Sequence, residues 1–314
     1  MRSLRDALRE YVAVRRALGT ELLEQAVALE HFLDFLDRER ATFITTKLAV
    51  RWACQRPGVQ PATWARRLTA VRRFARWLSA FDPRTEVPPE RVLDSLHRRP
   101  KPYIFTDQEI YHLMAEAAQL PPPKGLRART YATLIGLLAA TGLRPGEALR
   151  LTLPEVDLAN GILAVRHTKF DKSRFVPIDE STRTALVRYV QDRKRLCPGA
   201  QTDSLFVSER GGRLLPQVAR RTFALLSGAV GLRTLSGFRI GRGPRLQDIR
   251  HTFATRRLVE WYRAGLEVER ELPRLATYLG HVSIASTYWY VEAIPELLQL
   301  ATNRLQANRG GGAR

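Results

Sequence analysis

Apolar residues recur every three or four positions through the first part of the chain, a spacing typical of amphipathic helices. Two such stripes run through residues 4–14 and 22–36, and a third, shorter helix is expected to be capped by Thr45 or Thr46. A fourth stripe follows in residues 60–81. The pattern therefore predicts a small helical domain at the N-terminus.

This periodicity stops after Asp82, and five prolines fall between that residue and Tyr103. Proline fixes φ and lacks an N–H group, so a cluster of prolines is typical of a connecting segment. We therefore expect a first domain over residues 1–82, a linker over residues 83–104 and a second domain over residues 105–314.

The second domain combines helical and strand patterns. Residues 106–120 and 130–141 carry helical stripes, and residues 161–178 alternate around a polar turn at 170–173, which predicts a β-hairpin. Helical patterns resume from Ser181. The expected fold is mainly α-helical with a small antiparallel β-sheet.

The chain carries 51 Lys and Arg residues against 31 Asp and Glu, a net charge of +20, and its isoelectric point is near 10.9. Such a surplus indicates a polyanionic partner, for which DNA or RNA is the first choice. Genome bias also favours arginine, but bias alone need not leave acidic residues in such deficit. A solvated basic face is the alternative for any single arginine. The clustered residues predicted to lie on phosphates are Arg66, Arg67, Arg72, Arg73, Arg76, Arg98, Arg99 and Lys101.

Several protein classes fit the sequence poorly. No apolar run approaches the ~20 residues that span a bilayer, and the charged N-terminal segment lacks the apolar core of a secretory signal. Cys54 and Cys197 have no metal-ligand spacing and are expected to be reduced thiols. We therefore expect a cytoplasmic, nucleoid-associated protein with no membrane partner and no metal.

Two arginines stand in segments suited to phosphate chemistry. Arg144 lies in a turn between two predicted helices, in TGLRPGEA, and Arg250 lies on a helix, in QDIRHTFA. Two converging guanidiniums can neutralise the oxygens of a phosphodiester as charge builds in a transition state. A salt bridge between Arg144 and Glu147 is the structural alternative.

His281 and Tyr290 follow nine positions apart in the segment LGHVSIASTYWY. A tyrosine hydroxyl that attacks phosphorus conserves the bond energy as a phosphotyrosine ester, so the DNA can be resealed. A phenol with a pKa near ~10 needs help to lose its proton. From the residues alone, Tyr288 and Tyr278 compete for this role, and simple core packing of the aromatic run is also open.

Taken together and in this order, the segments resemble the tyrosine recombinase (phage integrase) family, including its Xer-like and mobile-element members. The family pattern T-G-L-R-x-x-E-L is matched by residues 141–148 except at its last position. The pattern T-K-x-x-K-x-R-x-V-P is matched by residues 168–177, and H-x-L-R-H-T-F-A by residues 247–254 except at its first and third positions. The L-G-H of residues 279–281 stands nine positions before the nucleophile.

This resemblance implies a role for each matched residue. Tyr290, not Tyr288, is the nucleophile, and Lys169, with Lys172 as the alternative, protonates the leaving 5′-oxygen. The residues implied in catalysis are Arg144, Lys169, Gln247, Arg250, His281 and Tyr290. The basic residues beside these motifs that we also expect to contact DNA are Lys172, Arg174 and Arg245.

Gln247 departs from the family pattern, which has histidine at this position. Glutamine exchanges hydrogen bonds but carries no proton at neutral pH. Gln247 can orient a phosphate oxygen while water or Lys169 handles protons, His251 can supply an imidazole from the next helical turn, or the enzyme can be slow. We favour the first interpretation.

The resemblance also implies the partners and the reaction. The N-terminal helices resemble a core-binding domain that clamps DNA, and protomers are expected to bind inverted half-sites of double-stranded DNA and to assemble as dimers and tetramers, with a partner recombinase as a further option. Strand exchange passes through a 3′-phosphotyrosine and a Holliday junction without a cofactor, for integration, excision or transposition of a mobile element.

A C-terminal helix over about 294–307, followed by a flexible tail, is expected to dock on a neighbouring protomer, with packing on its own domain as the alternative. The competing functions are a type IB topoisomerase-like activity and a non-catalytic accessory DNA-binding homologue.

Overall fold

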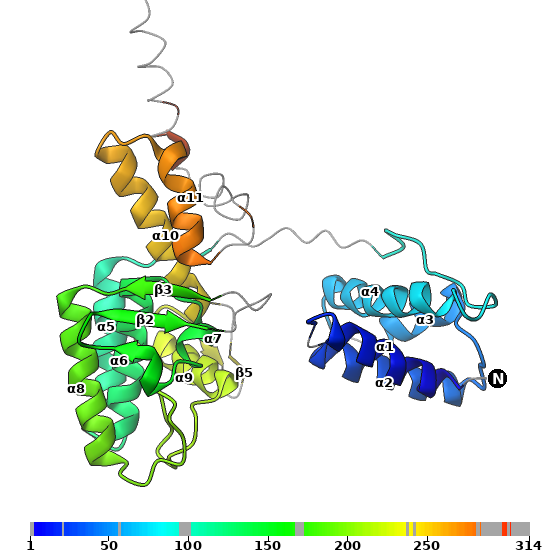
Figure 1. Ribbon diagram of the computed structural model, residues 1–314, viewed down its shortest axis with the longest axis horizontal. Coiled ribbons are helices and arrows are strands. Elements are labelled where there is room, and N and C mark those ends of the chain that lie inside the picture. The colour runs from blue at the N-terminus through cyan, green and yellow to red at the C-terminus, as the bar shows by residue number, and fades with distance from the viewer. Residues whose placement is uncertain are drawn as a thin grey trace, which may run out of the picture. The chain divides into compact units, whose positions relative to one another are not determined.

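The chain forms two compact units, residues 1–100 and residues 101–314, each with its own hydrophobic core (Figure 1). The boundary between the units falls inside the segment expected as a linker. The computed structural model describes residues 3–20, 22–55, 58–93, 102–166, 173–236, 239–240, 243–280, 283, 297–299 and 302.

Within these ranges the first unit contains the four helices that the apolar stripes predict. They are α1 (Leu4–Ala17), α2 (Leu23–Arg38), α3 (Thr46–Cys54) and α4 (Pro61–Leu78). Thr45 rather than Thr46 caps α3, since its side-chain oxygen accepts the Leu48 N–H at 3.2 Å. Pro61 begins α4 at a position where a missing N–H costs nothing.

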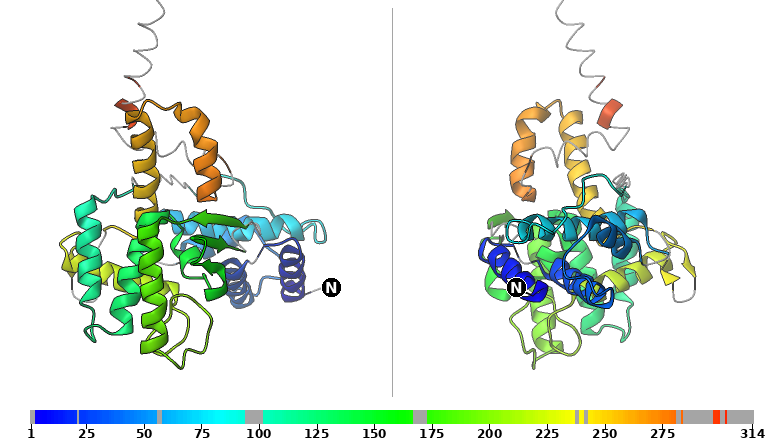
Figure 2. Two further views of the ribbon diagram at one scale, coloured as in Figure 1. Left: turned by 60° about the vertical axis from the view of Figure 1, so that its left-hand side comes forward. Right: turned by 90° about the vertical axis from the view of Figure 1, so that its right-hand side faces the viewer.

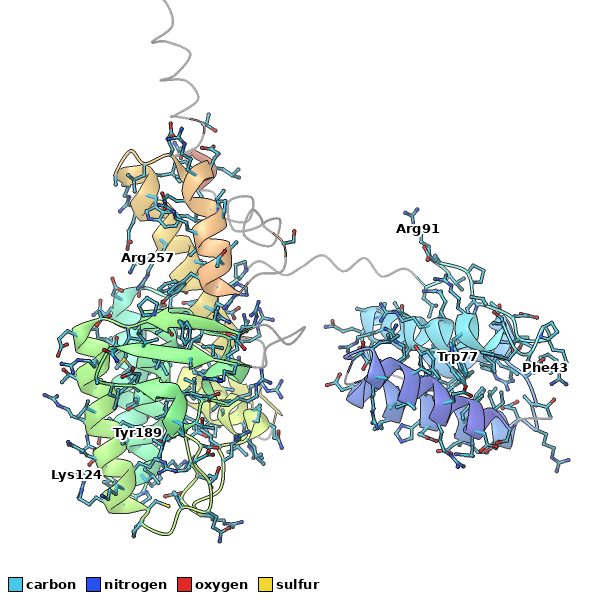
Figure 3. All side chains as sticks on the ribbon, in the orientation of Figure 1. Phe43, Trp77, Arg91, Lys124, Tyr189 and Arg257 are labelled. Carbon is cyan, nitrogen blue, oxygen red and sulfur yellow. The ribbon has the colours of Figure 1, made fainter. Side chains whose placement is uncertain are left out.

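The apolar faces of these helices meet in an aromatic core. Phe32, Phe74 and Leu68 are fully buried, and Trp52 packs on Phe32 with ring centroids 5.1 Å apart. Trp77, labelled in Figure 3, stacks on Phe74. Each fully buried side chain of this size contributes about 1.5–3 kcal/mol, so these contacts hold the four helices as one unit.

The proline-rich segment after α4 folds back onto this unit as far as residue 93. The backbone N–H of Glu86 donates to the Ile44 carbonyl, and the Glu86 carboxylate accepts the Thr46 N–H, both at 2.8 Å. Arg72 donates to the carbonyls of Pro88 and Pro89 at 2.7 Å. This stretch, expected as the start of a linker, is thus held to the unit by hydrogen bonds that involve backbone groups. Such bonds need no regular spacing of apolar side chains, so the sequence pattern does not reveal them.

The second unit is mainly helical with small antiparallel sheets, as expected. Its helices are α5 (Asp107–Ala118), α6 (Leu126–Thr141), α7 (Pro145–Ala148), α8 (Glu180–Leu196), α9 (Pro216–Ala229), α10 (Leu246–Arg263) and α11 (Val268–Leu279), with a 3-10 turn, η1 (Leu153–Glu155). Its strands are β1 (Val156–Asp157), β2 (Ile162–Val165), β3 (Arg174–Pro177), β4 (Leu235–Ser236) and β5 (Arg239–Ile240).

The predicted hairpin is confirmed as β2 and β3, which pair antiparallel in a sheet of order β1–β2–β3. Val165 lies opposite Arg174, so Arg174 is the first residue of β3. The turn that joins these strands, residues 167–172, lies outside the described residues. The strand β1 and the β4–β5 hairpin were not predicted, because two-residue strands are too short to show an alternating pattern.

Helix α6 runs through the centre of the second unit and packs against α5, α8 and α10 (Figures 1 and 2). Leu134, Ile135 and Leu138 are fully buried, because a helix that is apolar on all sides is stable only when covered on all sides. Tyr189 of α8, labelled in Figure 3, forms a hydrogen bond of 3.0 Å with Thr130 of α6.

Helices α10 and α11 lie side by side and form a second apolar cluster in this unit (Figure 2). Phe253 of α10 stacks on Tyr278 of α11, with ring centroids 5.7 Å apart. Leu297 is fully buried in the same cluster, so this residue of the expected C-terminal helix packs on its own chain. Most of that helix lies outside the described residues. None of the described helices is long and apolar enough to cross a membrane.

Candidate active site

Arg144 lies in the turn between α6 and α7. Gly142 ends α6 in the left-handed region, with φ of 60°, and a Cβ at this position would collide with the Phe253 ring, so the turn requires glycine. Arg144 donates to Glu147 Oε1 at 2.6 Å and to the Gly280 carbonyl at 2.8 Å. Its guanidinium is thereby held between α7 and the end of α11, with 34% of the side chain exposed.

Arg250 reaches the same place from α10. It is 1% exposed and donates to the Gly142 carbonyl at 2.9 Å and to the Leu279 carbonyl at 2.7 Å. Arg250 and Arg144 therefore bind the carbonyls of two consecutive residues, Leu279 and Gly280 respectively. The structure places both guanidiniums at the end of α11, and it also contains the Arg144–Glu147 salt bridge that was the structural alternative.

Arg174, expected among the DNA contacts, is turned into the unit and only 11% of its side chain is exposed. Its Nε donates to the Tyr278 carbonyl at 2.8 Å, and its Nη2 donates to Glu147 Oε2 at 2.8 Å. Glu147 is thus a buried carboxylate shared by Arg144 and Arg174. Burial acts to raise the pKa of Glu147, but the two guanidiniums outweigh it and hold the pKa below its usual value.

Gln247 lies half-exposed in the first turn of α10, one turn before Arg250. It lines a cavity of about 1150 Å³ together with Pro145 and Gly146 of α7. His251, the other candidate at this position, is half-buried one turn further along the same face. Gln247 therefore lies at a cavity whose lining begins at Pro145, the residue after Arg144.

The same cavity is strongly basic. The arginines that line it are Arg220, Arg221, Arg233 and Arg245. Arg245 forms an ion pair with Asp248 at 2.8 Å and is half-exposed, and burial lowers the pKa of Arg233. Sequence reasoning missed Arg220, Arg221 and Arg233, although two adjacent arginines on an amphipathic helix are a signal that could have been used.

Tyr278, one alternative nucleophile, is poorly suited to that role. Its ring stacks on Phe253, and burial raises the pKa of its hydroxyl, which makes the proton harder to remove. The other expected site residues lie outside the described residues. They are Lys169, Lys172, His281, Tyr288 and Tyr290, together with Arg98, Arg99 and Lys101.

The arginines of α4 divide into two groups. Arg67 lies over the Trp52 ring at 4.0 Å, and Arg72 is engaged by the carbonyls after the helix. The remaining three are exposed and, at spacings of seven and three residues, share one stripe of the helix. They are Arg66, Arg73 and Arg76. This stripe is the basic surface of α4 that is open to a polyanion.

Among the described residues, no group of three or more His, Cys, Asp or Glu side chains is placed to hold a metal ion. The polar groups described near α7, α10 and α11 are instead mainly guanidiniums, with the carboxylates of Glu147 and Asp248 paired to them and the amide of Gln247 close by. Such a set can bind the oxygens of a phosphate and stabilise negative charge.

Comparison with known proteins agrees with this chemistry. The phage integrase family matches residues 104–296. "Putative integrase/recombinase y4rB" of Sinorhizobium fredii is 44% identical over 311 residues, 98% of each chain. Tyrosine recombinase XerD of Caulobacter vibrioides is 34% identical over 244 residues, 77% of this chain and 74% of that protein.

The fold has a close counterpart among solved structures. The Tn1549 transposon integrase in complex with transposon right end DNA matches with a TM-score of 0.66 and 18% identity, over 96% of this chain and 99% of that chain. The chain belongs to the phage integrase family and is a tyrosine-type site-specific DNA recombinase, an enzyme that transfers DNA strands.

Proposed function

We propose that Tyr290 is the nucleophile of this recombinase and that Arg144 and Arg250 hold the scissile phosphate. The Tyr290 hydroxyl loses its proton to water as its oxygen forms a bond to phosphorus. The bond to the 5′-oxygen breaks in the same step, and Lys169 gives that oxygen its proton. Attack by the 5′-hydroxyl of a partner strand then reverses the step and releases Tyr290. One bond forms and one breaks in each direction, so no external energy source is consumed.

The observation that carries this proposal is the convergence of Arg144 and Arg250 on the carbonyls of Leu279 and Gly280. Both guanidiniums are anchored before any DNA binds, so little reorganisation is needed when charge develops on the phosphate. The next residue along the chain is His281. Removal of one such donor typically lowers the rate by about 10²–10³.

The proposal extends to the DNA. The exposed stripe of α4 and the arginines of the cavity offer two basic surfaces that can contact phosphates. We propose that protomers bind inverted half-sites of double-stranded DNA as dimers and assemble as tetramers. The y4rB protein is named as an integrase/recombinase and the Tn1549 integrase is bound to transposon DNA, so movement of a mobile element is the role we assign.

The nucleophile is tested with a nicked DNA duplex whose cleaved end diffuses away, which traps the covalent complex. The wild type is expected to form an adduct that survives a denaturing gel, with or without EDTA, and Tyr290→Phe is expected to form none. Tyr288→Phe is the matched control and should retain the adduct. An adduct with Tyr290→Phe but not with Tyr288→Phe would exchange the two roles.

A non-catalytic accessory protein is the second candidate, and Gln247 is the observation that favours it, since no histidine occupies that position. If Gln247 only orients a phosphate oxygen, Gln247→His should cleave no faster than the wild type in single turnover. A large increase in rate would show that an imidazole is missing here. Salt-sensitive DNA binding without any adduct would favour the accessory role.

A further inference from the structure

The end of α11 is held by three arginines from three different elements. The last carbonyls of a helix have no partner inside the helix. In α11 the Gly280 N–H serves the carbonyls of Ala276 and Thr277. Side-chain donors serve the next three carbonyls in order. Arg174 binds Tyr278, Arg250 binds Leu279 and Arg144 binds Gly280, at 2.7–2.8 Å. Positive charge at this end also offsets the helix dipole.

Arg174 differs from the other two arginines in what else it contacts. Its Nη1 and Nη2 face the two oxygens of Glu147 at 3.3 and 2.8 Å, and the same carboxylate binds Arg144. The guanidinium therefore joins the start of β3, the carboxylate of α7 and the end of α11. Only a planar fork of donors can satisfy both acceptors at once.

The backbone at Gly280 leaves room for this guanidinium. Gly280 has φ of 67°, and a Cβ at this position would lie 2.7 Å from Arg174 Nη1. Any side chain at position 280 would therefore push Arg174 away from the end of α11. The close approach of glycine and guanidinium is built into the turn that leads to His281.

We propose that Arg174 is a positioning residue, which holds Glu147 and the end of α11 together so that Arg144 stays aimed at the scissile phosphate, and that it does not itself contact DNA. This rests on the proposed role of Arg144. Three of the five N–H groups of Arg174 already have acceptors in the protein. A direct phosphate contact would have to break these bonds and leave Glu147 buried with one partner.

The test measures DNA binding and cleavage separately in Arg174→Lys. Lysine keeps the charge but is a single point donor. The dissociation constant and its salt dependence should be unchanged, and cleavage at saturating protein should fall by about 10²-fold, the effect of misplacing a group by 1 Å. Arg183→Lys is the matched control, because Arg183 pairs with Glu180 at the surface of the same unit. It should cleave like the wild type.

A second substrate separates positioning from a general loss of structure. A methylphosphonate at the scissile position replaces one charged oxygen by a methyl group, so less charge has to be neutralised. The defects of Arg174→Lys and Arg144→Lys should both shrink on this substrate. Equal losses on both substrates for Arg174→Lys would overturn the proposal, as would wild-type cleavage of the phosphodiester. A weaker affinity with a salt slope reduced by about 0.9 would assign Arg174 to a phosphate instead.

If Arg174→Lys unfolds at the assay temperature, cleavage is measured at a lower temperature at which circular dichroism shows every variant to be folded, with Arg174→Met and Glu147→Gln assayed there alone and combined. Arg174→Met should lower cleavage less in the Glu147→Gln background than in the wild type, because both act through one network. Additive losses would overturn the proposal. Absence of an adduct from the wild type would count against the proposed function itself, which is a separate result.

Discussion

At the scale of single residues, the candidate active site is organised around the buried carboxylate of Glu147. Glu147 has 2% of its side chain exposed and lies against the guanidiniums of Arg144 and Arg174. A buried charge is tolerated only when it is paired, so this carboxylate fixes both arginines and is fixed by them. The buried guanidinium of Arg250 is held in a similar way, by hydrogen bonds to the carbonyl oxygens of Gly142 and Leu279.

The carboxylate of Glu147 makes stability depend on pH. Its pKa is lowered in the folded state, so its contribution is fully present above the unfolded pKa of about 4.3 and is lost as the pH falls through the folded pKa. Glu147→Gln should lower the free energy of unfolding by about 3–5 kcal/mol at pH 7. The gap to the wild type should narrow below about pH 4, as followed by urea denaturation. A gap that stays constant down to pH 3 would contradict the ionised pair.

At the scale of elements, the arginines of α4 fall into two groups, one exposed to solvent and one bound to other groups of the first unit. Burial of Leu68, Val71 and Phe74 orients the helix, and this orientation leaves only one stripe of arginines open. Arg67 and Arg72 have the same chemistry but are used against Trp52 and the segment after the helix. Helix periodicity, rather than residue type, decides which arginines can meet DNA.

The exposed stripe of α4 can be removed without disturbing the helix. Replacement of Arg66, Arg73 and Arg76 by alanine should reduce the slope of log K against log salt by about 2.7, since each lost phosphate contact contributes about 0.9. The melting temperature should change little, because none of the three is buried. The measurement is DNA affinity by fluorescence anisotropy at several salt concentrations.

The control for this variant removes the same charge from another surface of the unit. Alanine at Arg9, Arg16 and Arg38 changes exposed arginines of α1 and α2. Arg9 pairs with Asp6, and Arg38 shares α2 with Asp34 and Asp37, which bind Arg5. A mixed surface of this kind attracts phosphates weakly. An equal loss of salt slope in the control would show that DNA binding follows net charge and not the α4 stripe.

At the scale of the whole molecule, the chain consists of two units with separate cores, and both units contribute to its excess of positive charge. Each unit buries its own apolar residues, and each presents basic side chains. Linked units bind a common ligand more tightly than separate ones, because the second contact is made at a high effective concentration. The affinity of the chain for DNA should therefore exceed that of its parts.

This is tested with fragments 1–93 and 102–314. Each should fold, with a cooperative loss of helical circular dichroism on heating. An equimolar mixture should bind the DNA site at least 10²-fold more weakly than the whole chain. A mixture that matches the whole chain would mean that one unit carries the binding alone.

The sequence by itself determined the family and the longer elements, because both depend on local patterns. The apolar spacing of α1 to α4 and the alternation of β2 and β3 predicted these elements, and the spacing of the motifs indicated Arg144 and Arg250. The contacts that hold the proline-rich segment to the first unit as far as residue 93, and the short strands, were not predicted, since neither produces a periodic pattern. Lys169, His281 and Tyr290 lie outside the described residues, so their roles remain predictions from the sequence.

Only the tertiary structure decided what the arginines do. Arg174 and Arg144 reach carbonyls 104 and 136 positions away in the chain, and a local pattern holds no record of such partners. The tertiary structure also places Arg220, Arg221 and Arg233 with Gln247 around one cavity. The physical reason is the same in each case: a guanidinium can pair with any acceptor that the fold brings within reach, and packing of distant elements chooses the acceptor.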